Sequence, residues 1–358
     1  MVKQKDSMRI LITGSMGYVG PILTRHLRQK FPDAELIGFD TAFFAHNLTG
    51  AIRLPESLLD RVHFGDIRNF PPELLDGVDV VVHLAAISND PMGKEFEGVT
   101  EAINEKASVA LAQMAEQRGV GRFVFASSCS IYGAAEGHPK RESDSLNPLT
   151  AYARSKVAME NALRASNAGE MTVTCLRFAT ACGMSDRLRL DLVLNDFVAS
   201  ALATGEITVL SDGTPWRPLI HVSDIARAFL AVLDAPREAV HAQALNVGRD
   251  DQNYRIREIA EIVKDTVPGC EIAFAEGAGP DKRNYRADFG KIARVLPGFR
   301  PEWDARRGAK QLYEAYKGIG LKVEDFEGPR YRRIDQIRQL MASGHLGEDL
   351  RWKEQPAA

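Results

Sequence analysis

The chain has 358 residues, of which 45% are hydrophobic and 26% charged, and its formal net charge is -3 at pH 7. This charge gives no electrostatic reason to expect nucleic acid or an anionic membrane as a partner. The four cysteines lack C-x-x-C spacing, which argues against a zinc site or a disulfide framework. A polar start and the lack of a long apolar run predict a soluble, cytoplasmic protein without a membrane span.

Short apolar runs alternate with helical patterns through the first half of the chain. The runs expected to be strands are Arg9–Thr13, Glu35–Asp40, Val78–Ala86, Arg122–Ser127 and Thr172–Arg177. Such alternation predicts βαβ units, and strands that are apolar at nearly every position are typical of a parallel sheet covered by helices on both faces. We therefore predict an α/β fold with a doubly wound parallel sheet.

The pattern changes after Arg177, where a loop is followed by a helical run from Leu192 to Ala203 and a turn-rich segment. We expect residues 1–177 to form the sheet domain, with residues 218–248 returning to it. We expect residues 178–217 and 249–330 to form a smaller C-terminal domain that binds the substrate. Residues 331–358 are highly charged with weak periodicity, which predicts a charged C-terminal tail.

A glycine-rich turn, G-S-M-G-Y-V-G at residues 14–20, directly follows the first strand and opens a helix. Glycines at such a turn let the backbone approach a pyrophosphate, which the helix N terminus stabilises. The next strand ends in Asp40, roughly twenty residues on, where a carboxylate can bind an adenosine ribose and would repel a 2′-phosphate. The pattern predicts a Rossmann domain that binds NAD. The contacts expected from it are Gly14, Gly17, Tyr18, Val19, Gly20 and Asp40.

Tyr152 and Lys156 stand four residues apart, on one face of a predicted helix. A tyrosine hydroxyl has a pKa of about 10, and an adjacent ammonium group favours the phenolate, so we expect Lys156 to shift that pKa toward working pH. Ser128 follows a predicted strand at the sheet edge where parallel-sheet enzymes bind ligands. We predict that Ser128, Tyr152 and Lys156 form a catalytic set for proton exchange.

Together these motifs resemble the extended short-chain dehydrogenase/reductases, the NAD-dependent nucleotide-sugar epimerase/dehydratase family, from residue 8 to about residue 300. The S-S-x-x-x-Y-G and Y-x-x-x-K motifs are present, as is a D-G-x-x-x-R-x-x-x-H-V-x-D segment from Asp212 to Asp224. The resemblance implies further cofactor contacts from Asp66, Ile67, Leu84, Ala85, Ala86, Asn104 and Phe178. It implies that Arg217 holds the diphosphate of a nucleotide sugar, and that Ser88, Asn89, Ser128, Thr180 and Asn195 also contact this substrate.

Two departures from the family narrow the reaction. Dehydratases of this group carry an Asp-Glu pair where this chain has Cys129 and Ser130, and decarboxylases carry a glutamate at the position of Ser130. We therefore expect an epimerase that acts through a transient 4-keto sugar. A dehydrogenase or ketoreductase with net redox change, an enzyme for a small alcohol and a non-catalytic NAD-binding protein are the alternatives.

The resemblance also implies a homodimer through helices of the NAD-binding domain. An apolar face around Ala107, Ala110, Leu111 and Met114 is compatible with such a contact, although it could equally pack on the sheet. No spacing of histidine and carboxylate residues indicates a metal site, and we expect His83 and His221 to have structural roles.

Overall fold

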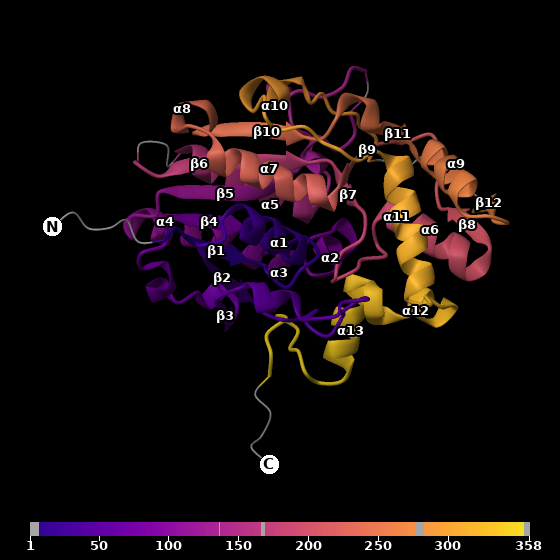
Figure 1. The fold of residues 1–358 in the computed structure, drawn as a ribbon, viewed down its shortest axis with the longest axis horizontal. Coiled ribbons are helices and arrows are strands. Elements are labelled where there is room, and N and C mark those ends of the chain that lie inside the picture. The colour runs from indigo at the N-terminus through magenta and orange to yellow at the C-terminus, as the bar shows by residue number, and fades with distance from the viewer. Residues whose placement is uncertain (1–6, 136, 166–168, 276–282, 354–358) are drawn as a thin grey trace, which may run out of the picture.

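The computed structural model describes residues 7–135, 137–165, 169–275 and 283–353. Its centre is a seven-stranded sheet in the order β10-β6-β5-β4-β1-β2-β3 (Figure 1). The strands are β1 (Arg9–Thr13), β2 (Glu35–Asp40), β3 (Arg61–Phe64), β4 (Val80–His83), β5 (Arg122–Ser128), β6 (Thr172–Phe178) and β10 (Gln243–Val247). All neighbouring strands in this sheet pair in parallel, which confirms the predicted Rossmann-like α/β fold.

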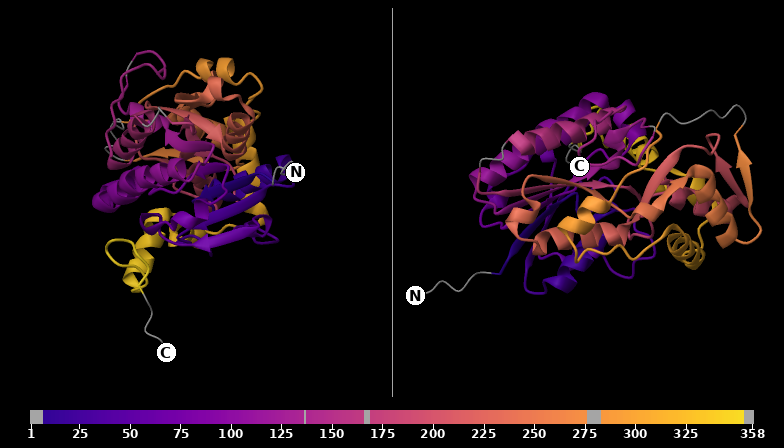
Figure 2. Two further views of the ribbon diagram at one scale, coloured as in Figure 1. Left: turned by 90° about the vertical axis from the view of Figure 1, so that its left-hand side faces the viewer. Right: turned by 90° about the horizontal axis from the view of Figure 1, so that it is seen from above.

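Helices cover both faces of this sheet (Figure 2). Ile10 and Ile12 of β1 join a core with α1 (Gly20–Lys30) and α7 (Val222–Asp234), whereas Leu11 joins the core on the opposite face. That second core includes residues of α4 (Ser108–Gln117) and α5 (Ala151–Ala165). Since successive side chains of a strand point to opposite faces, continuous apolar runs supply both cores.

The apolar face considered for a dimer contact is largely used within the chain. Ala107 and Leu111 are buried in the core beneath the sheet, and Met114 packs against this core. Ala110 is exposed. A homodimer stays a prediction, and a contact through this helix would have little apolar surface to bury.

The smaller domain has a core of its own at one end of the sheet (Figure 1). It contains α6 (Val193–Thr204), α9 (Ile256–Thr266), α11 (Ala305–Gly318) and the parallel pair β8 (Glu206–Val209) and β12 (Glu271–Phe274). A separate three-stranded sheet has the order β11 (Asn253–Arg255), β9 (Trp216–His221) and β7 (Thr180–Cys182). The shorter helices are α2 (Asp90–Glu95), α3 (Glu97–Glu101), α8 (Arg237–Val240), α10 (Gly290–Val295) and α12 (Val323–Glu327).

The C-terminal segment differs from the expected charged tail, because it folds back onto the NAD-binding domain. Helix α13 (Arg333–Ala342) begins this return. Ile337, Leu346 and Leu350 are buried in the same core as residues of the central sheet. The sequence did not indicate this packing, because only a few widely spaced apolar side chains anchor the segment among many charged residues.

His83 of β4 is buried, with Nδ1 2.7 Å from the Thr13 hydroxyl and Nε2 2.8 Å from the Ser108 hydroxyl. Burial lowers its pKa from 6.5 to about 3. The unfolded chain therefore binds an extra proton between these two pH values, and stability that is present above pH 6.5 is lost as the pH falls through this window.

We expect the free energy of unfolding of His83→Gln to fall less steeply with decreasing pH than that of wild type, by up to about 1.4 kcal/mol per pH unit. Urea unfolding of wild type and variant at several pH values between neutrality and pH 4 measures the slopes, with exposed His46→Gln as the control. Equal slopes in wild type and His83→Gln would contradict the expectation.

Candidate active site

A cavity of about 880 Å³ runs along the sheet edge where the central parallel strands end. The expected cofactor residues that line it are Gly14, Gly17, Tyr18, Val19, Asp40, Asp66, Ile67, Leu84, Ala85, Ala86, Tyr152, Lys156 and Phe178. The expected substrate residues that line it are Ser88, Asn89, Ser128, Thr180 and Arg217. Gly20, Asn104 and Asn195 are not among the lining residues.

The glycine turn is shaped by steric limits at both ends. Gly14 has a φ of 74°, and a Cβ added there would lie 2.7 Å from the backbone nitrogen of Ala85. A Cβ added to Gly20 would lie 2.0 Å from the carbonyl oxygen of Ser15. Gly14 therefore lets the turn approach the segment after β4, and Gly20 lets α1 pack tightly against its own turn.

The residues around this turn fit a dinucleotide. Among the described residues, no side chain caps the N terminus of α1, so its first N–H groups are available to a phosphate. The Asp40 carboxylate accepts hydrogen bonds from the backbone of Met16 at 2.9 Å and Ala42 at 2.8 Å. Asp40 thus holds the turn in place while it also lines the cavity.

Asn104 does not line the cavity but hydrogen-bonds to the segment that does. It is 1% exposed, and its side chain binds both the N–H and the carbonyl of Ile87, at 2.8 and 2.9 Å. Its amide also lies 3.2 Å from the Ser155 hydroxyl of α5. This residue therefore fixes the segment after β4 against the helix that carries Tyr152 and Lys156.

Ser128, Tyr152 and Lys156, the predicted catalytic set, line the same cavity. The Ser128 hydroxyl at the end of β5 hydrogen-bonds Tyr152, and Lys156 lies one turn further along α5. The Lys156 ammonium nitrogen donates to the Ala126 carbonyl at 2.8 Å and lies 5.5 Å from the centre of the Tyr152 ring.

The protonation of this set differs from the expectation. Burial, and to a smaller extent Asp90, raise the pKa of Tyr152 to about 12, although the hydrogen bond from Ser128 opposes them. Burial also lowers the pKa of Lys156 to about 7, so this residue is a weaker source of positive charge than a solvated lysine. Burial therefore outweighs the expected effect of Lys156, and Tyr152 is held as a phenol able to donate its proton.

A buried ion pair lies behind the catalytic helix. Arg177 of β6 and Glu160 of α5 are each 2% exposed and meet at 2.6 Å. The Ser127 hydroxyl donates to the same carboxylate at 2.5 Å. Because Ser127 precedes Ser128 and Glu160 follows Lys156 by one helical turn, this network links the strand and the helix that carry the catalytic set.

Asp90, which the sequence did not single out, lies near Tyr152 in the same cavity as Arg217. Asp90 accepts a hydrogen bond from the Thr150 hydroxyl at 2.6 Å and pairs with Arg283 at 2.9 Å. Arg217 is 8% exposed and donates to the Trp216 carbonyl at 2.8 Å and to the Arg283 carbonyl. Two guanidinium groups therefore stand at the end of the cavity expected to hold the substrate.

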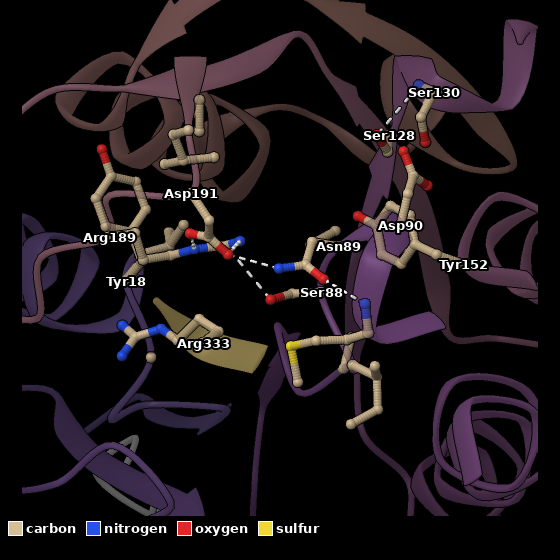
Figure 3. Close-up of a pocket in the computed structure, with 18 of the residues that line it drawn as sticks. Tyr18, Ser88, Asn89, Asp90, Ser128, Ser130, Tyr152, Arg189, Asp191 and Arg333 are labelled. Carbon is tan, nitrogen blue, oxygen red and sulfur yellow. Dashed lines mark hydrogen bonds and ion pairs between the residues drawn. The ribbon is translucent and has the colours of Figure 1, made fainter. Parts of the chain in front are cut away.

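A second polar group lies farther along the cavity (Figure 3). Arg189 pairs with Asp191 at 2.8 Å and donates to the Ser88 hydroxyl at 3.2 Å. The Asn89 amide donates to Asp191 at 2.5 Å. Ser88 and Asn89 are thus tied to the loop before α6, a contact between distant parts of the chain that no local spacing indicates.

Asn195, an expected substrate contact, does not line the cavity. It is fully buried, accepts a hydrogen bond from the Gly183 N–H at 2.9 Å and donates to the Arg189 carbonyl at 3.0 Å. Its amide is therefore used to shape the loop from Gly183 to Arg189. This loop contributes Arg189 to the cavity in its stead.

The two positions that depart from the dehydratase pattern have different settings. Cys129 is fully buried, and its thiol donates to the Arg177 carbonyl at 3.1 Å. Burial raises the pKa of this thiol well above its ordinary value. Ser130 lines the cavity, and its hydroxyl has no hydrogen-bond partner among the described residues. Neither position supplies a carboxylate.

Within the described part of the chain, no helix is long and apolar enough to cross a membrane. The same residues contain no group of three or more His, Cys, Asp or Glu side chains able to hold a metal ion.

Comparison with known proteins places these features in a family context. The sequence profile of the NAD dependent epimerase/dehydratase family matches residues 10–248. An uncharacterized UDP-glucose epimerase of Bacillus subtilis, YtcB, is 27% identical over 81% of this chain and 92% of its own length. UDP-glucuronic acid decarboxylase 1 of Xenopus tropicalis is 27% identical over 88% of this chain and 74% of its own.

The solved structure of MoeE5 in complex with UDP-glucuronic acid and NAD is 26% identical to this chain and superposes with a TM-score of 0.75. The match covers 87% of this chain and 99% of MoeE5. Family and neighbours therefore agree on NAD and on nucleotide sugars, but they span epimerases and decarboxylases.

Proposed function

Because the chain belongs to the NAD-dependent epimerase/dehydratase family, we propose that it is a nucleotide-sugar epimerase that acts through a transient 4-keto intermediate. The observation that carries this proposal is the chemistry beside Tyr152. The cavity presents hydroxyls from Ser128 and Ser130, while the positions that bear acid-base carboxylates in dehydratases and decarboxylases are Cys129 and Ser130.

Asp90 is a carboxylate near Tyr152, but its contacts argue against a role as a mobile acid or base. Its two oxygens are engaged by Thr150 at 2.6 Å and by Arg283 at 2.9 Å. Both oxygens are therefore committed to fixed partners. We therefore assign Asp90 to the positioning of Arg283 and of the helix start at Thr150.

In this proposal Tyr152 handles the proton of the sugar 4-hydroxyl. Bound NAD supplies the hydride acceptor. Tyr152 is a phenol in the ligand-free cavity, so it would first release its own proton to solvent. The phenolate would then take the hydroxyl proton as the ketone forms and return it when the alcohol is restored on the other face of the sugar. Ser128 donates a hydrogen bond that favours the phenolate during this exchange, and Lys156 offers a nearby positive charge.

Arg217 is proposed to hold the substrate diphosphate. A guanidinium group presents a planar set of N–H donors that matches phosphate oxygens, and Arg217 is held by two backbone carbonyls within the cavity wall. The UDP-sugars named for YtcB and bound to MoeE5 make a UDP-sugar the first candidate for this site.

The test is to incubate the purified protein with UDP-, GDP-, CDP- and dTDP-sugars and to follow both the sugars and the absorbance of reduced cofactor. We expect a sugar isomer without accumulation of NADH. Stoichiometric NADH would instead identify a dehydrogenase. Loss of water or carbon dioxide from the sugar would contradict the inference that a site with Cys129 and Ser130 in place of carboxylates does not catalyse dehydration or decarboxylation. Inactivity toward all four nucleotide classes would contradict a nucleotide-sugar substrate.

A further inference from the structure

A buried cation that has no ion-pair partner among the described residues lines the cavity at a distance from Tyr152. Arg333, the first residue of α13, is 2% exposed. Its guanidinium lies on the ring of Phe44, 4.0 Å from the ring centre, and donates one hydrogen bond to the Arg187 carbonyl at 3.0 Å. Its Nη1 atom has no hydrogen-bond partner among the residues that the structure describes.

Nearby carboxylates are already engaged by other groups. Glu56 lies 3.1 Å from Arg187, and Asp191 pairs with Arg189 at 2.8 Å. Asp40 accepts two backbone N–H groups. Burial and these neighbouring arginines lower the pKa of Arg333 to about 9, although Asp191 and Asp40 oppose them.

A buried charge without a counterion destabilises a folded protein. An anionic ligand in the cavity would remove this cost. The guanidinium is already held over the Phe44 ring and by one hydrogen bond, so its position is fixed before any ligand arrives.

The contacts between the loop around Arg187 and the glycine turn indicate which anionic ligand Arg333 would bind. The loop that accepts its hydrogen bond also contacts the glycine turn, because the Tyr18 hydroxyl donates to the Gly183 carbonyl at 2.6 Å and Ser185 donates to the Tyr18 carbonyl at 2.7 Å. Figure 3 shows Arg333 on the same side of the cavity as Tyr18, with Ser128 and Tyr152 on the other. The diphosphate of a dinucleotide lies at such a turn.

We propose that Arg333 is a cofactor-binding residue whose guanidinium pairs with the diphosphate of NAD, so that the C-terminal segment closes over the bound cofactor.

Contacts farther along the segment support this closure. The Trp352 indole donates to the Thr41 carbonyl at 2.6 Å, and its ring lies 5.6 Å from that of Phe43. Arg351 donates to the Asn69 side chain at 2.5 Å. Thr41 and Phe43 directly follow Asp40 and line the cavity. The segment thus supports Thr41 and Phe43, which line the part of the cavity where we expect the adenosine to bind.

Titration calorimetry of nucleotide-stripped protein tests the proposal with Arg333→Met, Arg333→Lys and the control Arg338→Met. Arg338 lies on the same helix but is exposed and pairs with Glu95. The probes are NAD, ADP-ribose and UDP, since the first two carry the cofactor diphosphate and the third carries that of the substrate. Thermal unfolding without nucleotide is measured in parallel.

We expect Arg333→Met to weaken binding of NAD and ADP-ribose by about tenfold or more, and UDP by less than about twofold. Arg333→Lys should lie between wild type and Arg333→Met, and Arg338→Met should bind as wild type does. The melting temperature of ligand-free Arg333→Met should equal or exceed that of wild type, because an unpaired buried charge has been removed.

Two results would overturn the proposal. A lower melting temperature with unchanged ADP-ribose affinity would show that Arg333 only supports the fold. A selective loss of UDP affinity would assign the guanidinium to the substrate diphosphate. If Arg333→Met does not fold, the same titrations on Arg333→Lys test the proposal. A lysine cannot reproduce the bidentate contact of a guanidinium with a diphosphate. An unaltered affinity of Arg333→Lys for ADP-ribose would therefore contradict such a contact.

Discussion

Replacing Tyr152 with phenylalanine is expected to lower kcat by about 10²- to 10⁴-fold, since a positioned acid-base group contributes roughly this much to a reaction. The change removes only the hydroxyl that meets Ser128. The ring and its contacts with Lys156 remain, so the dissociation constant for NAD should change by less than about threefold. Steady-state kinetics on the best nucleotide sugar and titration with NAD measure the two quantities.

A matched control is Tyr313→Phe on α11, which removes a tyrosine hydroxyl outside the cavity lining. This control should keep full activity. Wild-type kcat in Tyr152→Phe would show that the proton moves through another group. Inactivity of wild type and variant on every sugar would instead favour the non-catalytic NAD-binding alternative.

Breaking the ion pair between Arg177 and Glu160 should have the largest effect on stability. Both side chains are buried, and removal of one partner leaves the other as an unpaired charge in the core. We expect Arg177→Met or Glu160→Met alone to lower the free energy of unfolding by about 3–5 kcal/mol. The double substitution should cost less than the sum, because it leaves no unpaired charge and fills a similar volume.

Urea unfolding of the wild type, both single variants and the double variant measures this coupling. A cost below about 1 kcal/mol for each single variant would mean that water reaches the pair and that its contribution resembles that of a surface salt bridge. Strictly additive costs would contradict direct coupling between the two charges.

The central strands could be predicted from the sequence because both faces of the sheet are covered, which makes each strand a continuous apolar run. Strand β3 (Arg61–Phe64) was not predicted, since it lies at the sheet edge and its residues are half-buried or exposed. The return of the C-terminal segment was also not predicted. Ile337, Leu346 and Leu350 are too widely spaced among charged residues to show a helical period.

The same contrast holds for the site. Gly14, Asp40 and Ser128 lie at one cavity because parallel strands end at the same edge of a sheet, so residues at strand ends meet in space. Tyr152 reaches the same cavity from the first turn of α5. Asn195 matched a family position, yet its amide is used within the loop after β7.

Residues brought in by tertiary structure could not be found from local spacing. Asp90 meets Arg283, and Arg189 meets Ser88, across long stretches of chain. Arg333 comes from a segment that was expected to lie outside both domains. Only the fold shows that Asp90, Arg189 and Arg333 line the same cavity as the predicted substrate residue Ser88.

The most direct test of the proposed epimerase uses UDP-glucose that carries deuterium at C4. In the proposed reaction the hydride removed from C4 returns to the same carbon, so the product should be an isomer of equal mass that retains the deuterium at C4. Mass spectrometry and NMR of the released sugar measure this outcome. A product that has lost water, or one that has lost the deuterium to solvent or to free NADH, would contradict epimerisation through a transient 4-keto sugar.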